Sequence, residues 1–162
     1  MQDVWYFAYG SNMDMARLET ARLIPEGLRV KDRVLGRVDG WQLVFNKPWS
    51  KFSGGGAANI MEHPTAHIYG TLNLMDPRGL DVLDHYEGVS GGHYRRAPLC
   101  VARPAYNDVV DAVVYLADGE LDAMLIPPRF YLDHLLEGRD LLPADYKNFL
   151  EGFETLPILN EG

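Results

Sequence analysis

The order of strand-forming and helix-forming segments is the feature that most constrains the fold of this chain. β-Branched and aromatic residues are concentrated in segments that follow one another through the first two-thirds of the sequence, and helical spacing dominates the last third. Because strands and helices do not alternate regularly, this order predicts an α+β domain around a curved, mostly antiparallel sheet or small barrel. The expected strands are residues 4–9, 28–38, 41–46, 57–61, 67–75, 94–103 and 110–116.

Proline and glycine mark most ends of the expected helices. Asp76 and Pro77 form a helix-start signal, with Asp as the N-cap and Pro at the first helical position, and Gly88 ends that helix. The sequence has no internal repeat, low-complexity tract or linker, so residues 1–162 are expected to form a single domain. The other expected helices are residues 13–23, 128–136 and 143–153.

Composition narrows the class of protein. The formal net charge is −8, from 23 acidic and 15 basic side chains, which argues against a nucleic-acid-binding surface. No apolar run approaches the roughly 20 residues that span a bilayer, and the N-terminus has no secretory signal pattern, so no membrane partner is expected. The single cysteine, Cys100, lies in an apolar run and is predicted to be buried and reduced. A cytoplasmic location follows as an expectation.

The segment VWYFAYGSNMDM, residues 4–15, breaks abruptly at Tyr9 and Gly10. One interpretation is structural: Ser11 or Asn12 caps the next helix and Asp14 favours its first turn. The other is functional, because a strand–glycine–helix junction directs unpaired backbone N–H groups at one point and favours an anion there. The sequence has no GxGxxG and no GxxxxGK[ST] motif, so a carboxylate or an oxyanion is favoured over a phosphate. The two interpretations are compatible.

The segment LDHYEGVSGGHY, residues 83–94, contains a carboxylate in an unfavourable place. Glu87 falls at the C-terminal end of an expected helix, where the helix dipole is negative, and Asp84 lies one turn earlier. Both features, together with apolar neighbours, are expected to raise the pKa of Glu87. A carboxylate of raised pKa beside a glycine loop suits general acid/base catalysis near neutral pH. The alternative is a solvated glutamate at a frayed helix end.

Other candidate residues are weaker. His63 and His67 are four apart, but Pro64 prevents a regular helix through them, which argues against a zinc site. No serine lies in a GxSxG context, so a serine hydrolase is not supported. Three basic residues could bind a substrate carboxylate, although the default expectation is that they are surface charges. They are Lys47, Arg95 and Arg96.

Two motifs together resemble the γ-glutamylcyclotransferase family: FAYGSNM at residues 7–13 and LDHYEGVSGGHYRR at residues 83–96. The family signature is a Tyr-Gly-Ser-Asn loop after the first strand and a catalytic glutamate in a Glu-Gly sequence. The segments FNK, AANIMEHP, IYGTLNLMD and PPRFYLDHLLEGRDLLPADY extend the likeness over nearly the whole chain in the same order. The length suits the bacterial subgroup, which includes an enzyme that removes a γ-glutamyl group from an aminoglycoside intermediate.

The resemblance implies an α+β fold with a small mixed, mostly antiparallel β-barrel and flanking α-helices. It also implies the reaction and the residues that serve it. The α-amine of a γ-glutamyl group attacks its own γ-carbonyl, 5-oxoproline forms and the amine leaves, with no metal and no cofactor. Glu87 is the implied general acid/base, and the glycine loop at 54–56 is a further candidate for the α-carboxylate. The expected partner is a small γ-glutamyl substrate, and the protein is expected to be a monomer or homodimer. The implied substrate-binding residues are Tyr9, Gly10, Ser11, Asn12, Met13, Tyr94 and Tyr131.

Three alternatives remain open at the level of sequence. One is a γ-glutamylamine cyclotransferase, against which Asn12 argues because that group is expected to carry another residue there. The second is a non-catalytic small-ligand binding module of the same fold, and the third is a hydrolase that releases glutamate. The leaving amine is not identified, although the net charge of −8 favours a neutral or cationic one.

Overall fold

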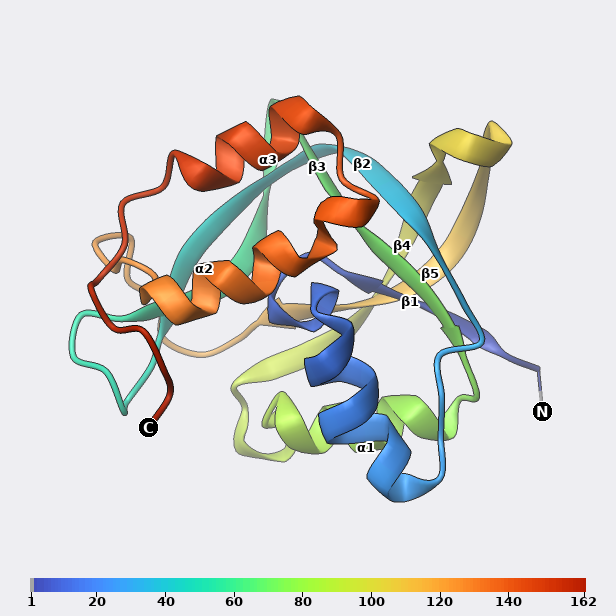
Figure 1. The fold of residues 1–162 in the computed structure, drawn as a ribbon, viewed down its shortest axis with the longest axis horizontal. Coiled ribbons are helices and arrows are strands. Elements are labelled where there is room, and N and C mark those ends of the chain that lie inside the picture. The colour runs from blue at the N-terminus through green and yellow to red at the C-terminus, as the bar shows by residue number, and fades with distance from the viewer. Residues whose placement is uncertain (1) are drawn as a thin grey trace.

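The computed structural model describes residues 2–162 and has a closed β-barrel with helices on its outside (Figure 1). The strands follow the order β1-β3-β2-β4-β5 around the barrel, and all neighbours are antiparallel except β1 and β5, whose parallel pairing closes it. The mixed, mostly antiparallel barrel expected from the sequence is therefore confirmed. The strands are β1 (Val4–Ala8), β2 (Asp32–Pro48), β3 (Gly56–Met75), β4 (Tyr94–Arg103) and β5 (Asp108–Ala117).

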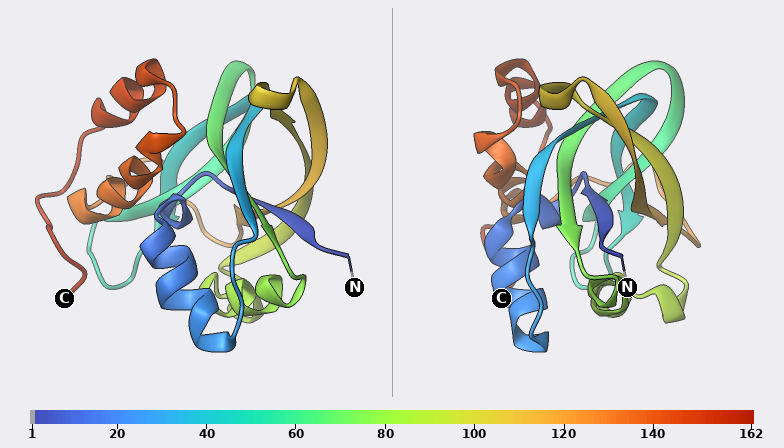
Figure 2. Two further views of the ribbon diagram at one scale, coloured as in Figure 1. Left: turned by 45° about the vertical axis from the view of Figure 1, so that its right-hand side comes forward. Right: turned by 90° about the vertical axis from the view of Figure 1, so that its right-hand side faces the viewer.

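The helices cover two regions of the barrel. In all three orientations, α2 (Arg129–Leu136) and α3 (Ala144–Glu151) lie together on one side, while α1 (Arg78–Tyr86) lies at one end (Figures 1 and 2). The 3₁₀ turn η1 (Ser11–Met13) and the π-helix η2 (Ala16–Leu23) lie between these regions and contact both. The remaining 3₁₀ turns are η3 (Ile24–Glu26), η4 (Val89–Gly91), η5 (Pro104–Tyr106) and η6 (Glu137–Asp140). Among residues 2–162, no helix is long and apolar enough to cross a membrane.

Two strands are longer than the sequence suggested. The expected break in the chain at Gly40 is instead a bulge within β2, where Gly40 has a φ of +85°. Opposite it, the pairing passes from His67 to Glu62 on β3, so Pro64 lies in an unpaired stretch where no N–H is required. The predictions of separate strands at 28–38 and 41–46, and at 57–61 and 67–75, are wrong because bulges bend the strands without ending them.

The prediction that Cys100 is buried is wrong. Its side chain is exposed on β4, whereas the next residue, Val101, is fully buried in the barrel core. Side chains of a strand alternate between its two faces, so an apolar run does not by itself bury each member. The helix start is also shifted by one residue, because α1 begins at Arg78, although the Asp76 carboxylate still accepts a hydrogen bond from the Arg78 N–H at 2.9 Å.

A pair of glycines makes room for the largest fully buried side chain, that of Phe7. Gly36 and Gly70 are direct partners across β2 and β3, and both lie against the ring of Phe7, which is fully buried. A Cβ at Gly36 would lie 2.9 Å from the Phe7 Cε1 atom and 2.7 Å from the Val101 Cγ1 atom. The glycines therefore allow β1, which leads directly into the Tyr9–Gly10 junction, to pack closely on its neighbours.

The Gly36→Ala variant should lower the free energy of unfolding by about 1–3 kcal/mol, the usual cost of overpacking a core. Urea denaturation of the variant and of the wild-type protein measures this loss. If the ring of Phe7 is the obstacle, Gly36→Ala combined with Phe7→Leu should cost at least about 0.5 kcal/mol less than the sum of the single changes. Simple additivity of the two losses would contradict the packing argument.

Candidate active site

Glu87 is the carboxylate around which the site is built. It follows the last residue of α1, its N–H donates to the Leu83 carbonyl at 2.8 Å, and its side chain is partly buried. Gly88 then reverses the chain with a φ of +62°, which ends the helix as the sequence predicted. This left-handed turn leaves the Glu87 side chain at the wall of a small cavity of about 40 Å³.

The opposite wall depends on an unpaired backbone segment of β3. The pairing between β2 and β3 passes from Asn59 to Ala57, which leaves Ala58 in a bulge without a strand partner. Its N–H donates to the Tyr131 hydroxyl at 3.0 Å, and its carbonyl accepts from the Tyr94 hydroxyl at 2.7 Å. Tyrosines from α2 and β4 are thereby fixed to one peptide of β3.

Four of the five tyrosines that line the small cavity fall into two groups by what their hydroxyl protons do. Tyr94 donates to Ala58, and Tyr9 donates to the Tyr115 carbonyl at 2.6 Å, so these protons are used inside the protein. Tyr131 accepts from Ala58, and Tyr6 accepts from the Asn12 side-chain amide at 3.0 Å, so those bonds leave the hydroxyl protons of Tyr6 and Tyr131 available. The cavity therefore has two phenolic donors.

The third side of the cavity is the junction after β1. Ser11 and Asn12 begin a 3₁₀ turn, and their N–H groups consequently have no acceptor within it. Gly10 favours close approach, since a Cβ there would lie 3.2 Å from the Ala58 Cβ atom, a tight contact, and 3.4 Å from the Tyr131 hydroxyl. The Asn12 amide nitrogen also lies 3.5 Å from a Glu87 carboxylate oxygen. Backbone N–H groups and the general acid/base candidate thus border the same space.

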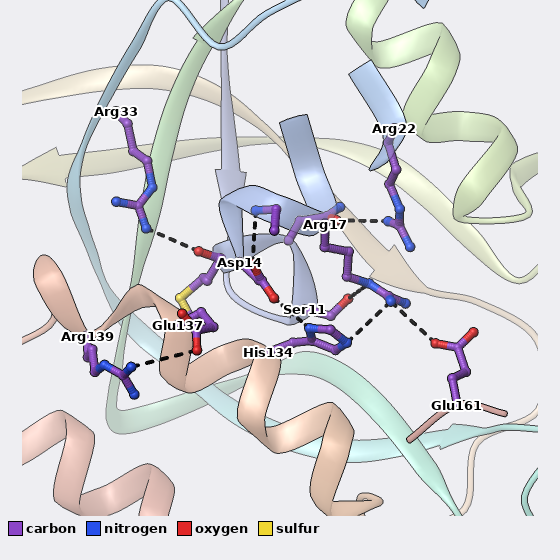
Figure 3. Close-up of polar contacts among 12 residues, drawn as sticks. Ser11, Asp14, Arg17, Arg22, Arg33, His134, Glu137, Arg139 and Glu161 are labelled. Carbon is purple, nitrogen blue, oxygen red and sulfur yellow. Dashed lines mark hydrogen bonds and ion pairs between the residues drawn. The ribbon is translucent and has the colours of Figure 1, made fainter. Parts of the chain in front are cut away.

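The helix-cap interpretation of Ser11 and Asn12 is wrong. Neither side chain caps η1 or η2; instead the Asp14 carboxylate accepts from the Ala16 N–H at 3.0 Å. Ser11 Oγ accepts from Arg17 Nε at 3.1 Å, in a group of polar contacts beneath the junction (Figure 3). The same group ties Asp14 to His134 of α2 at 2.8 Å. The polar side chains of the junction hold the turn against α2 and the site.

Most of the predicted site residues line the small cavity, and one does not. The Met13 side chain is fully buried in the core and lies beside Gly138, so it does not reach the cavity. The predicted residues that do line the cavity are Tyr9, Gly10, Ser11, Asn12, Glu87, Tyr94 and Tyr131. The sequence analysis missed Tyr6, Ala58 and Tyr115, which line it too.

Burial dominates the electrostatics of the cavity. It raises the pKa of Glu87, while the positive charges of Arg22 and Arg17 act in the opposite direction. The direction agrees with the sequence prediction, but Asp84 is not its cause, because its carboxylate pairs with Arg96 at 2.6 Å and with the Tyr115 hydroxyl at 2.7 Å. Burial also raises the pKa of Tyr6 and Tyr131, so both phenols remain neutral donors.

An outer cavity of about 420 Å³ shares Glu87 and Tyr94 with the small one. Its lining contains more cationic than anionic side chains, including Arg17, Arg22 and Lys47. Lys47 is buried, and its ammonium group donates to the Asp118 carbonyl at 2.7 Å. The structure thus offers a place for a group attached to a ligand whose reacting end occupies the small cavity.

Several expected anion-binding groups lie elsewhere. The Gly55 and Gly56 N–H groups already donate to the Phe52 and Ile126 carbonyls, so the glycine loop at 54–56 does not supply them to an anion. Arg96 pairs with the Asp81 and Asp84 carboxylates on the protein surface. Of the three basic candidates, only Lys47 lines the outer cavity beside Glu87.

A second depression lies away from Glu87. It has a volume of about 560 Å³, runs along α3 against the β2–β3 hairpin, and is lined by Tyr146, Phe149 and Phe153 among others. It shares no residue with the cavities beside Glu87. Within residues 2–162, no cluster of three or more His, Cys, Asp or Glu residues is arranged to hold a metal ion. The chemistry-bearing side chains are gathered around Glu87.

Comparison with known proteins connects this geometry to a family. The model of the AIG2-like family matches residues 67–150, more than half of the sequence. The chain belongs to the AIG2-like family. The matched region includes β4, β5, α1 and α2, and thereby Glu87, Tyr94 and Tyr131 of the cavity.

Individual relatives agree with the expected resemblance to γ-glutamylcyclotransferases. The γ-glutamylcyclotransferase of Bos taurus is 34% identical over 92 residues, which are 55% of this chain and 46% of that protein, and the human one is 33% identical over the same shares. The chain thus matches about half the length of these curated relatives. A solved γ-glutamyl cyclotransferase structure has a TM-score of 0.80 and 21% identity, covering 99% of this chain and 93% of that one. At this identity the structural likeness shows the fold.

The raised pKa of Glu87 predicts how the stability of the Glu87→Gln variant depends on pH. A carboxyl whose pKa is raised by folding stabilises the protein below its unfolded-state pKa, and this contribution is lost as pH rises through the folded-state pKa. Glu87→Gln should therefore match the wild-type protein near pH 4 and exceed it in free energy of unfolding at pH 8. The expected gain is about 1.4 kcal/mol per unit of pKa shift.

Urea denaturation at several pH values measures the difference between the two proteins. Glu62→Gln, at an exposed position on β3, is the matched control. A Glu87→Gln variant that is less stable than wild type at pH 8 would contradict the assignment of burial as the dominant effect.

Proposed function

We propose that this protein is a γ-glutamylcyclotransferase with Glu87 as its general acid/base. The observation that supports this most directly is the position of Glu87: a partly buried carboxylate of raised pKa borders the same cavity as the start of a turn whose first two N–H groups have no acceptor within it. The reaction requires a group that moves protons and an adjacent site for an oxyanion. Membership of the family, and the names of the curated relatives, agree with this proposal.

The proton transfers can be assigned to one carboxylate. In the ionised form, Glu87 takes a proton from the α-ammonium group of the substrate, and the free amine attacks the γ-carbonyl carbon. The bond between that carbon and the leaving nitrogen then breaks as protonated Glu87 gives its proton to the leaving nitrogen. The attacking nitrogen loses its second proton to Glu87, which passes it to the freed amine, so the amine leaves as an ammonium ion. The products are 5-oxoproline and a free amine, and Glu87 ends ionised as it began, so no water is consumed.

The remaining groups bind and fold the substrate. The N–H groups of Ser11 and Asn12 are the proposed donors to the oxygen that becomes negative at the γ-carbon. The hydroxyl protons of Tyr6 and Tyr131 are available for the α-carboxylate. Because the reaction is intramolecular, a narrow cavity contributes chiefly by holding the γ-glutamyl chain in its folded form and by excluding water. The cytoplasmic location and the monomeric or homodimeric state remain predictions.

The decisive test measures 5-oxoproline by mass spectrometry against a panel of γ-glutamyl compounds. Glu87→Gln should lose about 10²- to 10⁴-fold in kcat, the range for a positioned general acid/base, because an amide cannot carry the proton. Circular dichroism and thermal unfolding establish that this variant is folded. A folded variant that keeps most of its activity would remove Glu87 from the mechanism.

Blocking the α-amine separates cyclisation from hydrolysis. An N-acetylated γ-glutamyl donor has no free amine to attack, so amine release should stop. Continued release, with glutamate derivatives as the other product, would instead indicate a hydrolase. Binding of γ-glutamyl compounds without any turnover would favour the non-catalytic module.

The charges that line the outer cavity relate to the charge of the leaving amine. The net charge of −8 favours a neutral or cationic group, but the local charges beside Glu87 are those of Arg17, Arg22 and Lys47. Glu161 pairs with Arg17 at 3.4 Å, whereas within residues 2–162 no carboxylate lies within ion-pair distance of Lys47. We therefore propose a leaving amine that itself carries a carboxylate, with Lys47 as a charge available to bind it.

A γ-glutamyl amino acid should accordingly be turned over with a kcat/KM about tenfold or more above that of its C-terminal amide, since a charge-assisted hydrogen bond contributes about 1.5–3 kcal/mol. Steady-state kinetics on the matched pair of substrates measures the preference. Lys47→Met should reduce it, while Arg95→Met, at an exposed position on β4, serves as the control. Equal or better turnover of the amide would exclude this leaving-group class.

A further inference from the structure

Arg22 is a buried cation that the reaction scheme above does not use. Its side chain comes from η2, and only 9% of the residue is exposed. Its Nη1 atom donates to the Asn12 side-chain oxygen at 2.8 Å, and its guanidinium lies 4.6 Å from the centre of the Tyr86 ring. Within residues 2–162, no carboxylate lies within 4.0 Å of its nitrogens. Burial and the neighbouring Arg17 lower the pKa of Arg22.

The π-helical conformation of η2 explains how two arginines reach the same site. The N–H of Ile24 bonds to the Glu19 carbonyl, five residues earlier, which is the π-helical pattern. Residues five apart in an α-helix point about 140° away from each other, whereas the wider turn brings them to one side. Arg17 and Arg22 are five apart, both line the outer cavity, and Figure 3 shows both side chains extending from this segment toward the junction.

The bond from Arg22 decides which way the Asn12 amide faces. A guanidinium has only donors, so Asn12 presents its oxygen to Arg22. The NH₂ group is then directed at the Tyr6 hydroxyl, 3.0 Å away, and at Glu87, 3.5 Å away. Rotation of the amide by half a turn would place its oxygen against the Glu87 carboxylate and leave Arg22 facing two hydrogens. Arg22 therefore selects the orientation in which Asn12 supports both groups.

Arg22 also provides charge where burial disfavours a carboxylate. Positive charge from Arg22 acts on Glu87 more strongly than that from Arg17, against the larger effect of burial. The other titratable groups that face Glu87 are neutral phenols or lie in the outer cavity. In the small cavity they are Tyr6 of β1, Tyr9 just after β1, Tyr94 of β4, Tyr115 of β5 and Tyr131 of α2. Around the outer cavity they are Arg17, Lys47, His85, Tyr86, His93 and Glu161.

We propose that Arg22 is a positioning residue for Glu87, which fixes the orientation of the Asn12 amide and supplies the charge that allows an ionised carboxylate in the cavity. This rests on the proposed function for its catalytic meaning, although the effect on the Glu87 carboxylate stands independently of it. The two roles are separable, because lysine keeps the charge but is one bond shorter, so its ammonium group does not reach the position from which Arg22 Nη1 donates to Asn12.

The test compares Arg22→Gln and Arg22→Lys with Arg139→Gln, an exposed control on η6. In ¹³C-glutamate-labelled protein, the Glu87 carboxyl resonance is assigned by its loss in Glu87→Gln and then titrated. Arg22→Gln should raise its pKa by about one to three units, the size of the effect of a nearby opposite charge. The acid limb of the kcat/KM profile should move upward by the same amount, so activity falls more at pH 6 than at pH 9.

Arg22→Lys should keep the Glu87 titration near that of the wild-type protein while kcat falls, because the Asn12 amide is no longer held. An unchanged titration in Arg22→Gln overturns the charge role, and a wild-type kcat in Arg22→Lys overturns the orienting role. If Arg22→Gln does not fold, the Lys variant alone still decides the second role. If no γ-glutamyl compound is turned over, the cyclotransferase proposal fails while the carboxyl titration continues to test Arg22.

Discussion

The unpaired peptide of Ala58 is the constraint on which the site depends. The register shift in the β2–β3 pairing leaves Ala58 without a partner residue, and a buried polar group without a hydrogen bond costs about 1–3 kcal/mol. The Tyr131 and Tyr94 hydroxyls satisfy both groups. Because these tyrosines come from α2 and β4, one irregularity in β3 joins a helix and a distant strand into a single wall. Gly10 completes the arrangement, since a side chain there would meet Ala58 and Tyr131.

The fold was largely predictable because its elements follow local patterns of apolar, glycine and proline residues. Strand order in the barrel and the parallel closure between β1 and β5 were not, since they depend on long-range pairing. The two long strands were predicted as fragments because Gly40 and Pro64 are breakers in an isolated segment but are accommodated in a bulge. Cys100 was misplaced for a related reason, namely that hydrophobicity of a run does not tell which face each residue occupies.

The candidate site was predictable where a short motif carries it. Glu87 and the junction from Tyr9 to Asn12 stand in recognisable sequence, and both line the cavity. Met13 belongs to the same motif but packs in the core, since the 3₁₀ turn directs it away from Asn12. Arg22 could not be predicted from the sequence, because its role depends on a π-helix. In an α-helix of 3.6 residues per turn, the side chains of Arg17 and Arg22 would point in different directions. Ala58 could not be predicted either, since it contributes to the site through its backbone and not through its side chain.

The local charges and the net charge of the protein have opposite signs, and the local ones govern the site. Water and salt screen surface carboxylates beyond about 8–10 Å, whereas charges in a partly buried cavity are screened much less. Glu87 is thus subject to two opposing effects of its immediate surroundings, burial and the two arginines of η2. In the proposed reaction Glu87 must both accept and return a proton, which works best when neither effect fixes its protonation state. The arginines bond to Asn12 and Ser11, and within residues 2–162 neither forms a direct ion pair with Glu87.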